Sequence, residues 1–139
     1  MAAKVKYDDV NVGDALEPSE YRVERVNLVM YAGASGDFNP IHWNPSFAKM
    51  VGLPDTIATG MHTMARIGKY VTDWTGDPGA VRRFSNRFTQ PVVVPDEGQT
   101  VGIRGTVAEK LDGNQVKLTL EAFVGETNVS QAEAVVALG

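Results

Sequence analysis

The sequence predicts a single α+β domain in which one long helix precedes a set of strands. The 139 residues suffice for one compact domain with a buried core. A helical apolar pattern occupies residues 59–74, and much of the chain after residue 80 alternates between apolar and polar residues, as strands do. No repeat, linker or low-complexity tract divides the chain, so residues 1–139 are expected to form one unit.

The N-terminal part is expected to hold a strand followed by a short helix. Residues 21–26 alternate enough for a strand. Asn27 can cap a helix over residues 28–31, because a short polar side chain accepts a hydrogen bond from the first N–H groups of a helix. Gly33 and Gly36 are expected to end this helix.

A loop and a second short helix come next. Pro40 and Pro45 interrupt the chain here, and proline disfavours a continuous helix because it lacks the N–H donor. Asn44 can cap a helix that has Pro45 at its first position and runs towards Met50.

The longest helix is expected to begin after Thr59, which can cap it, and to end near Trp74. Glycines and a proline in residues 76–79 stop it. One face carries apolar or small residues and is expected to be core: Met61, Met64, Ala65, Gly68 and Val71. Another face carries a polar stripe: His62, Arg66, Lys69 and Asp73.

The remainder of the chain predicts an antiparallel meander. The strand candidates are residues 81–88, 92–94, 101–107, 116–122 and 129–138. Turn-forming residues separate the later ones at 112–114 and 125–128. A sheet with one apolar face needs the long helix to cover that face.

Composition removes several classes of function. There is no cysteine, which excludes disulfides, thiolate catalysis and cysteine-bound metal. The net charge of −4 comes without a basic cluster, so no nucleic-acid partner is expected. No apolar run could span a bilayer and residues 1–9 do not resemble a secretory signal, so a cytoplasmic protein without a membrane partner is expected.

The segment GDFNPIH, residues 36–42, is the strongest candidate for chemistry. The chain has only two histidines, and histidine is the side chain best suited to moving protons at neutral pH. Pro40 stiffens the loop, which can then aim Asp37, Asn39 and His42 at one water molecule. The carboxylate and the imidazole would each accept a hydrogen from that water, and the amide would orient it.

Gly60 is the second candidate. The first N–H groups of a helix lack intrahelical partners, and a glycine lets a ligand carbonyl approach them closely. Such a site could stabilise the enolate oxygen of a thioester.

Plainer interpretations stand beside these. Asp37 can form an Asx-turn, His42 can simply be a hydrogen-bonded histidine, and Gly60 can be only a helix start. His62 lies in the polar stripe and is expected to have no catalytic role. Asp37, His42 and His62 could ligate a metal, but their spacing matches no familiar metal motif.

The string ASGDFNPIH, residues 34–42, resembles the signature of the MaoC-like, (R)-specific enoyl-thioester hydratases. Further strings fit the same family: IATGM at 57–61, GDPGAV at 76–81 and NRF at 86–88. Within that family, the chain is similar to the dyad-bearing subunit of the actinobacterial (3R)-hydroxyacyl-carrier-protein dehydratases. The resemblance covers nearly the whole chain.

The resemblance implies a hotdog fold, in which an antiparallel sheet wraps around the long helix. It implies that Asp37 and His42 form a catalytic dyad that Asn39 supports, and that the Gly60 N–H polarises the thioester carbonyl. The implied reaction interconverts trans-2-enoyl and (3R)-hydroxyacyl thioesters of coenzyme A or acyl carrier protein, with no metal or redox cofactor.

The acyl pocket is where the chain departs from its relatives. Pro40, Thr59 and Met61 are expected to contact the substrate. However, many relatives have histidine where this chain has Thr59, and an apolar residue where it has His62. The preferred acyl chain length is therefore left open.

Two other functions remain compatible with the sequence: a non-catalytic hotdog subunit that binds an acyl chain, and a hotdog thioesterase. Pairing of a sheet edge with another chain would hide unpaired backbone groups. The resemblance accordingly implies either a homodimer or a heterodimer with a related hotdog subunit.

Overall fold

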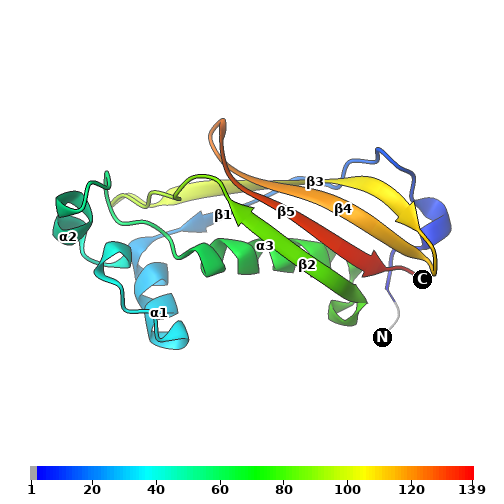
Figure 1. The fold of residues 1–139 in the computed structure, drawn as a ribbon, viewed down its shortest axis with the longest axis horizontal. Helices are drawn as coiled ribbons and strands as arrows, with labels where there is room; N and C mark the ends of the chain where they lie inside the picture. Colours follow the sequence, from blue (N-terminus) through cyan, green and yellow to red (C-terminus); the bar gives the residue numbers. More distant parts are fainter. Residues whose placement is uncertain (1–2) are drawn as a thin grey trace.

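A computed structural model describes residues 3–139 and contains one five-stranded antiparallel sheet with a long helix, α3, lying along it (Figure 1). The strands are β1 (Ser19–Val23), β2 (Val81–Phe88), β3 (Gln99–Leu111), β4 (Gln115–Val124) and β5 (Thr127–Ala137). The α-helices are α1 (Arg25–Ser35), α2 (Pro45–Met50) and α3 (Gly60–Thr75), and the short 3-10 helices are η1 (Tyr7–Asp9), η2 (Pro40–His42) and η3 (Pro78–Ala80). The predicted α+β class and hotdog architecture are confirmed.

The sheet order is β1-β3-β4-β5-β2. The predicted meander is confirmed for β3, β4 and β5, which pair in sequence order across the two expected turns. β2 instead joins the free side of β5, and β1 pairs with β3 at the opposite edge. The expected strand at residues 92–94 is only an isolated bridge between Val93 and Ile57, since this segment runs beside the α2–α3 connection rather than in the sheet.

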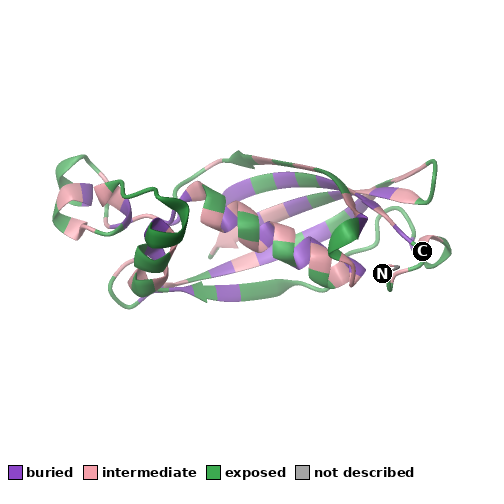
Figure 2. Ribbon diagram, turned by 90° about the horizontal axis from the view of Figure 1, so that it is seen from below, coloured by how far each residue is buried: buried purple, intermediate pink, exposed green. Residues whose placement is uncertain are grey.

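The inner face of the sheet and one face of α3 form the core. Leu118, Leu120 and Val136 are fully buried on the strands, and Ile67 is fully buried on the helix. Each such side chain contributes about 1.5–3 kcal/mol by leaving water. Figure 2 shows buried and exposed residues alternating along the strands that lie behind α3.

The predicted core face of α3 is partly wrong. Its buried residues are Thr63, Ile67, Tyr70, Val71 and Thr75. Met61 and Ala65 are exposed, because the sheet contacts the helix along the row that contains Ile67 and Val71. Apolar composition suggested the face, but the position of the sheet decides it.

The predicted boundaries of α1 also need correction. The helix begins at Arg25 rather than after Asn27, since Asn27 occupies the third helical position and its Oδ1 accepts the Glu24 N–H at 2.8 Å. Gly33 lies within the helix. Gly36 ends it, with a left-handed φ of 76° that suits glycine.

Helix α2 agrees with its prediction, because Asn44 Oδ1 accepts the Phe47 N–H and Pro45 is the first helical residue. Helices α1 and α2 lie together beyond one end of the sheet, next to the N-terminal end of α3 (Figure 1). The loop that contains residues 36–42 belongs to this lobe. Among residues 3–139, no helix has the length and hydropathy needed to span a membrane.

Candidate active site

The loop after α1 is built from two consecutive side-chain turns. Asp37 Oδ1 accepts the Asn39 N–H at 3.2 Å, and Asn39 Oδ1 accepts the Ile41 N–H at 3.3 Å. Pro40 then opens the 3-10 helix η2 with its restricted φ. The Asx-turn interpretation of Asp37 is therefore correct, and these turns present the next residues in a defined direction.

His42 is buried, with only 6% of its surface exposed. Its Nδ1 lies 2.6 Å from the carbonyl oxygen of Ile57. A carbonyl oxygen can only accept a hydrogen bond, so Nδ1 carries the proton in the neutral ring and Nε2 presents a lone pair. This lone pair faces the Asp37 carboxylate, with 3.7 Å between His42 Nε2 and Asp37 Oδ2.

That separation suits a shared water molecule better than a direct bond. Hydrogen bonds of this type are usually about 3 Å or shorter, so the two side chains are not tightly paired. One water can lie about 2.8 Å from both atoms and donate a hydrogen to each. The Asp37 side chain is 46% exposed, which gives water access to this position.

Gly60 is the first residue of α3, and none of the hydrogen bonds found among residues 3–139 uses its N–H. A second reason for glycine appears here. A Cβ at this position would lie 2.9 Å from Phe88 Cζ, because the half-exposed ring of Phe88 covers the helix start. Glycine is thus required by Phe88 as well as suited to an approaching carbonyl.

One pocket joins His42 to Gly60. Its volume is about 330 Å³, and mostly apolar groups line it. Its remaining lining residues are Ile57, Ala58, Thr63, Phe88, Thr89, Gln90, Pro91, Val92 and Val129. The pocket thus places a proton-accepting nitrogen and a free helical N–H around a space that can hold an acyl group.

The other predicted site residues lie around this pocket rather than in its wall. Asp37 and Asn39 are on the exposed loop, and Pro40 is half-buried. Thr59 is buried at the cap position of α3, but its hydroxyl makes no capping bond and has no partner in the described part of the chain. The Met61 side chain is exposed.

Ile57 and Phe88 were not singled out by sequence reasoning. Ile57 acts through its backbone carbonyl, for which a side-chain pattern carries no signal. Phe88 ends a strand that is distant in sequence from Gly60, and only the fold brings the two together.

His62 lies on α3 in a separate environment. Its ring makes edge contacts with the rings of Tyr31 and Tyr21, with centroids 5.4 and 6.1 Å away. Burial, and then the charge of Arg66, lower the pKa of His62 below its usual value of 6.5. Within residues 3–139, no three His, Cys, Asp or Glu side chains gather as metal ligands would.

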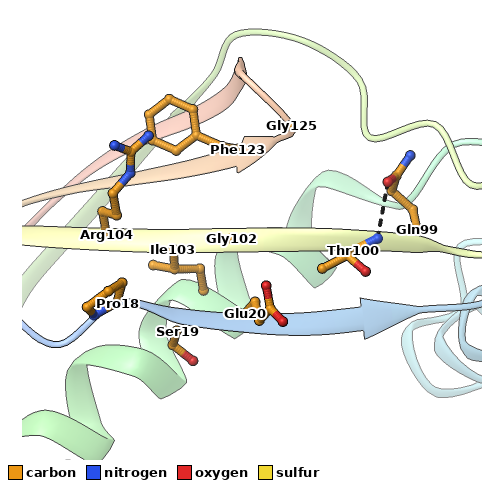
Figure 3. Close-up of a pocket in the computed structure, with 10 residues that line it drawn as sticks. All are labelled: Pro18, Ser19, Glu20, Gln99, Thr100, Gly102, Ile103, Arg104, Phe123 and Gly125. Carbon is orange, nitrogen blue, oxygen red and sulfur yellow. Dashed lines mark hydrogen bonds between the residues drawn. The ribbon is translucent and has the colours of Figure 1, made fainter.

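A larger, open pocket of about 630 Å³ lies over β1, β3 and β4 (Figure 3). There the guanidinium of Arg104 stacks on the Phe123 ring at 4.0 Å, and Glu20 stands on the neighbouring strand. Neither histidine lines this pocket. The smaller pocket at His42 is therefore the better candidate for acid–base chemistry.

Comparison with known proteins matches residues 9–128 to the family described as "MaoC like domain". The 3-hydroxyacyl-thioester dehydratase X of Mycobacterium tuberculosis is 42% identical over 74 residues, which are 53% of this chain and 25% of that protein. A solved "MaoC-like dehydratase" is 36% identical with a TM-score of 0.94, over 96% of this chain and 42% of the other. The (R)-hydratase PhaJ1 from Pseudomonas aeruginosa is 26% identical with a TM-score of 0.86, over 99% and 88%.

Proposed function

Because the chain belongs to the family of MaoC-like hydratases and dehydratases, we propose that it interconverts trans-2-enoyl and (3R)-hydroxyacyl thioesters. The observation that carries this proposal is the His42 Nε2–Asp37 Oδ2 pair at 3.7 Å, next to a pocket that contains the free Gly60 N–H. A single catalytic water and a single carbonyl site are what this reaction requires.

In the proposed mechanism, water binds between Asp37 and His42 and its oxygen adds to the β-carbon of the enoyl group. One hydrogen of the water passes to the dyad, and the α-carbon receives a proton from the same site. Both additions occur on one face, so the addition is syn. The Gly60 N–H stabilises the enolate-like thioester oxygen between the two steps. Dehydration is the same sequence reversed.

The Ile57 carbonyl supports this assignment, because it sets the imidazole tautomer that can accept a proton from water. The Asn39 side chain acts on the backbone turn and orients the loop. Coenzyme A and acyl carrier protein are both acceptable carriers, since the dyad contacts only the acyl part.

We also propose that a second hotdog chain completes the protein. The matched region spans only 25% of dehydratase X and 42% of the MaoC-like dehydratase, so these relatives contain considerably more chain. β2 is an edge strand, and its unpaired backbone groups suit pairing with another strand. The partner is either a second copy or a related subunit. Light scattering of the purified chain, and co-purification from the native host, distinguish the two.

Crotonyl-coenzyme A tests the reaction. We expect loss of the conjugated enoyl absorbance without release of free thiol. Asp37→Asn and His42→Ala should each lower turnover by about 10²–10⁴-fold. Thiol release would indicate a thioesterase instead, and normal hydration by both variants would refute the mechanism. Acyl binding without either reaction would indicate the non-catalytic subunit.

A further inference from the structure

Ile57 contacts the turn that holds His42 through both of its backbone groups. Its N–H donates to the Ile41 carbonyl at 3.1 Å, and its own carbonyl accepts from His42 Nδ1 at 2.6 Å. The direction of the imidazole therefore depends on where the chain at residues 55–58 lies.

The neighbouring strand segment holds residues 56–58 on the opposite side. The Thr56 hydroxyl donates to the Val94 carbonyl at 2.8 Å, and the Val94 N–H donates to the Thr56 carbonyl at 2.7 Å. The Ala58 N–H donates to the Val92 carbonyl at 2.9 Å. These bonds fix the spacing between the two segments, but they leave residue 55 as the point where the chain enters from the connection after α2.

An ion pair holds that point. Asp55 Oδ1 accepts the Thr56 N–H at 2.8 Å and the Arg25 Nη2 group at 2.6 Å. The Thr56 N–H, and less strongly the charge of Arg25, keep the pKa of Asp55 below its ordinary value. Arg25 is the first residue of α1, so the pair ties the segment before α3 to the start of the helix before the catalytic loop.

Arg25 also binds a second carboxylate, which provides an internal comparison. Its Nη1 lies 3.0 Å from Asp96 Oδ1. The Asp96 side chain is 92% exposed, whereas that of Asp55 is 16% exposed. Only Asp55 is joined by hydrogen bonds to the backbone that reaches His42.

We propose that Asp55, held by Arg25, is a positioning residue that acts on His42 through the Ile57 carbonyl. Its catalytic consequence rests on the proposed hydratase function, but its effect on the imidazole does not. Without the Asp55 carboxylate, the segment can shift, the contact to Nδ1 loosens, and both tautomers become populated. A displacement of about 1 Å at a reacting group can cost about 10²-fold in rate, so a partial loosening should cost about tenfold.

The test compares Asp55→Asn with Asp96→Asn, because each removes one carboxylate from the same arginine. For Asp55→Asn we expect turnover of crotonyl-coenzyme A to fall about tenfold with KM changed less than about twofold. For Asp96→Asn we expect no change in either. ¹⁵N NMR of the imidazoles gives the second measurement, and it is simple because the chain has two histidines. His42 should be protonated at Nδ1 in the parent and in Asp96→Asn, and mixed in Asp55→Asn.

The two measurements separate the possible failures. If Asp55→Asn loses turnover but keeps the Nδ1 tautomer, or if the two variants behave alike, the proposal is wrong. If the parent does not hydrate crotonyl-coenzyme A, the proposed function fails while the NMR comparison still decides the positioning role. Should Asp55→Asn not fold, Arg25→Lys takes its place, because lysine keeps the charge but lacks the two-pronged geometry. A wholly Nδ1-protonated His42 in that variant would likewise overturn the proposal.

Discussion

The two histidines of this chain occupy contrasting environments near the start of α3. His42 has a carbonyl at one ring nitrogen and a carboxylate near the other. His62 has two tyrosine rings around it, and its buried Nδ1 has no hydrogen-bond partner in the described residues. The first arrangement orients a ring and gives it a proton partner, while the second simply packs a flat side chain.

The electrostatic surroundings extend this difference. Arg66 lies near His62 and stacks on the Tyr21 ring at 4.4 Å, so protonation of His62 would place two positive charges together in a partly buried cluster. Asp37 lies next to His42, where its carboxylate would stabilise a positive imidazolium. An acid–base role therefore depends on what each ring nitrogen faces, and burial alone does not confer it.

The largest expected effect separates the two residues by activity. His42→Ala should lower turnover of an enoyl thioester by about 10²–10⁴-fold. His62→Phe keeps a flat ring between the two tyrosines and should stay within about threefold of the parent. Steady-state rates on crotonyl-coenzyme A measure both. Equal losses in the two variants would show that the groups facing each ring do not decide its role.

Much of this contrast could be predicted from sequence, because the residues of the loop are close together along the chain. Asp37, Asn39 and His42 lie within one short, proline-containing segment, and the side-chain turns between them are local. The strands β3 to β5 were equally accessible, since alternation is a local pattern.

The features that escaped prediction mostly depend on contacts between distant segments. Neither the Ile57 carbonyl at His42 nor the Phe88 ring at Gly60 leaves a trace in the sequence around its partner. The aromatic surroundings of His62 escaped for the same reason, because its position in a polar stripe suggested solvent. The start of α1 was misplaced for a local reason, since Asn27 bonds backwards to the Glu24 N–H rather than opening the helix.

An intermediate effect concerns Gly60, which forms the wall opposite His42. In Gly60→Ala the new methyl group would meet the Phe88 ring, and displacement of that half-exposed ring should cost about 1 kcal/mol and lower turnover about tenfold. Adding Phe88→Leu should restore most of the rate to the level of Phe88→Leu alone. Rates and melting temperatures of the three variants provide the measurement. If the double variant remains as slow as Gly60→Ala, the methyl group obstructs the substrate itself, and glycine is needed for the approach of the carbonyl.

The smallest expected effect is the pH dependence of stability that His62 contributes. The pKa of His62 is lowered in the fold, so around and below pH 6.5 the unfolded chain binds a proton at this residue more readily than the folded chain. Stability from this source is present above about pH 6.5 and is lost as the pH falls through the folded pKa. Melting temperatures should therefore fall less in His62→Phe than in the parent between about pH 8 and about pH 5.5.

Arg66→Gln refines this last test, because it removes only the second cause of the shift. Burial, the larger cause, remains, so its loss of stability on acidification should lie between those of the parent and His62→Phe and closer to the parent. Since His42 is present in all three proteins, its own titration contributes equally and cancels from the comparison. Parallel curves for the parent and His62→Phe would mean that His62 is as easily protonated in the fold as in the unfolded chain. The aromatic cluster would then no longer account for the difference between the two histidines.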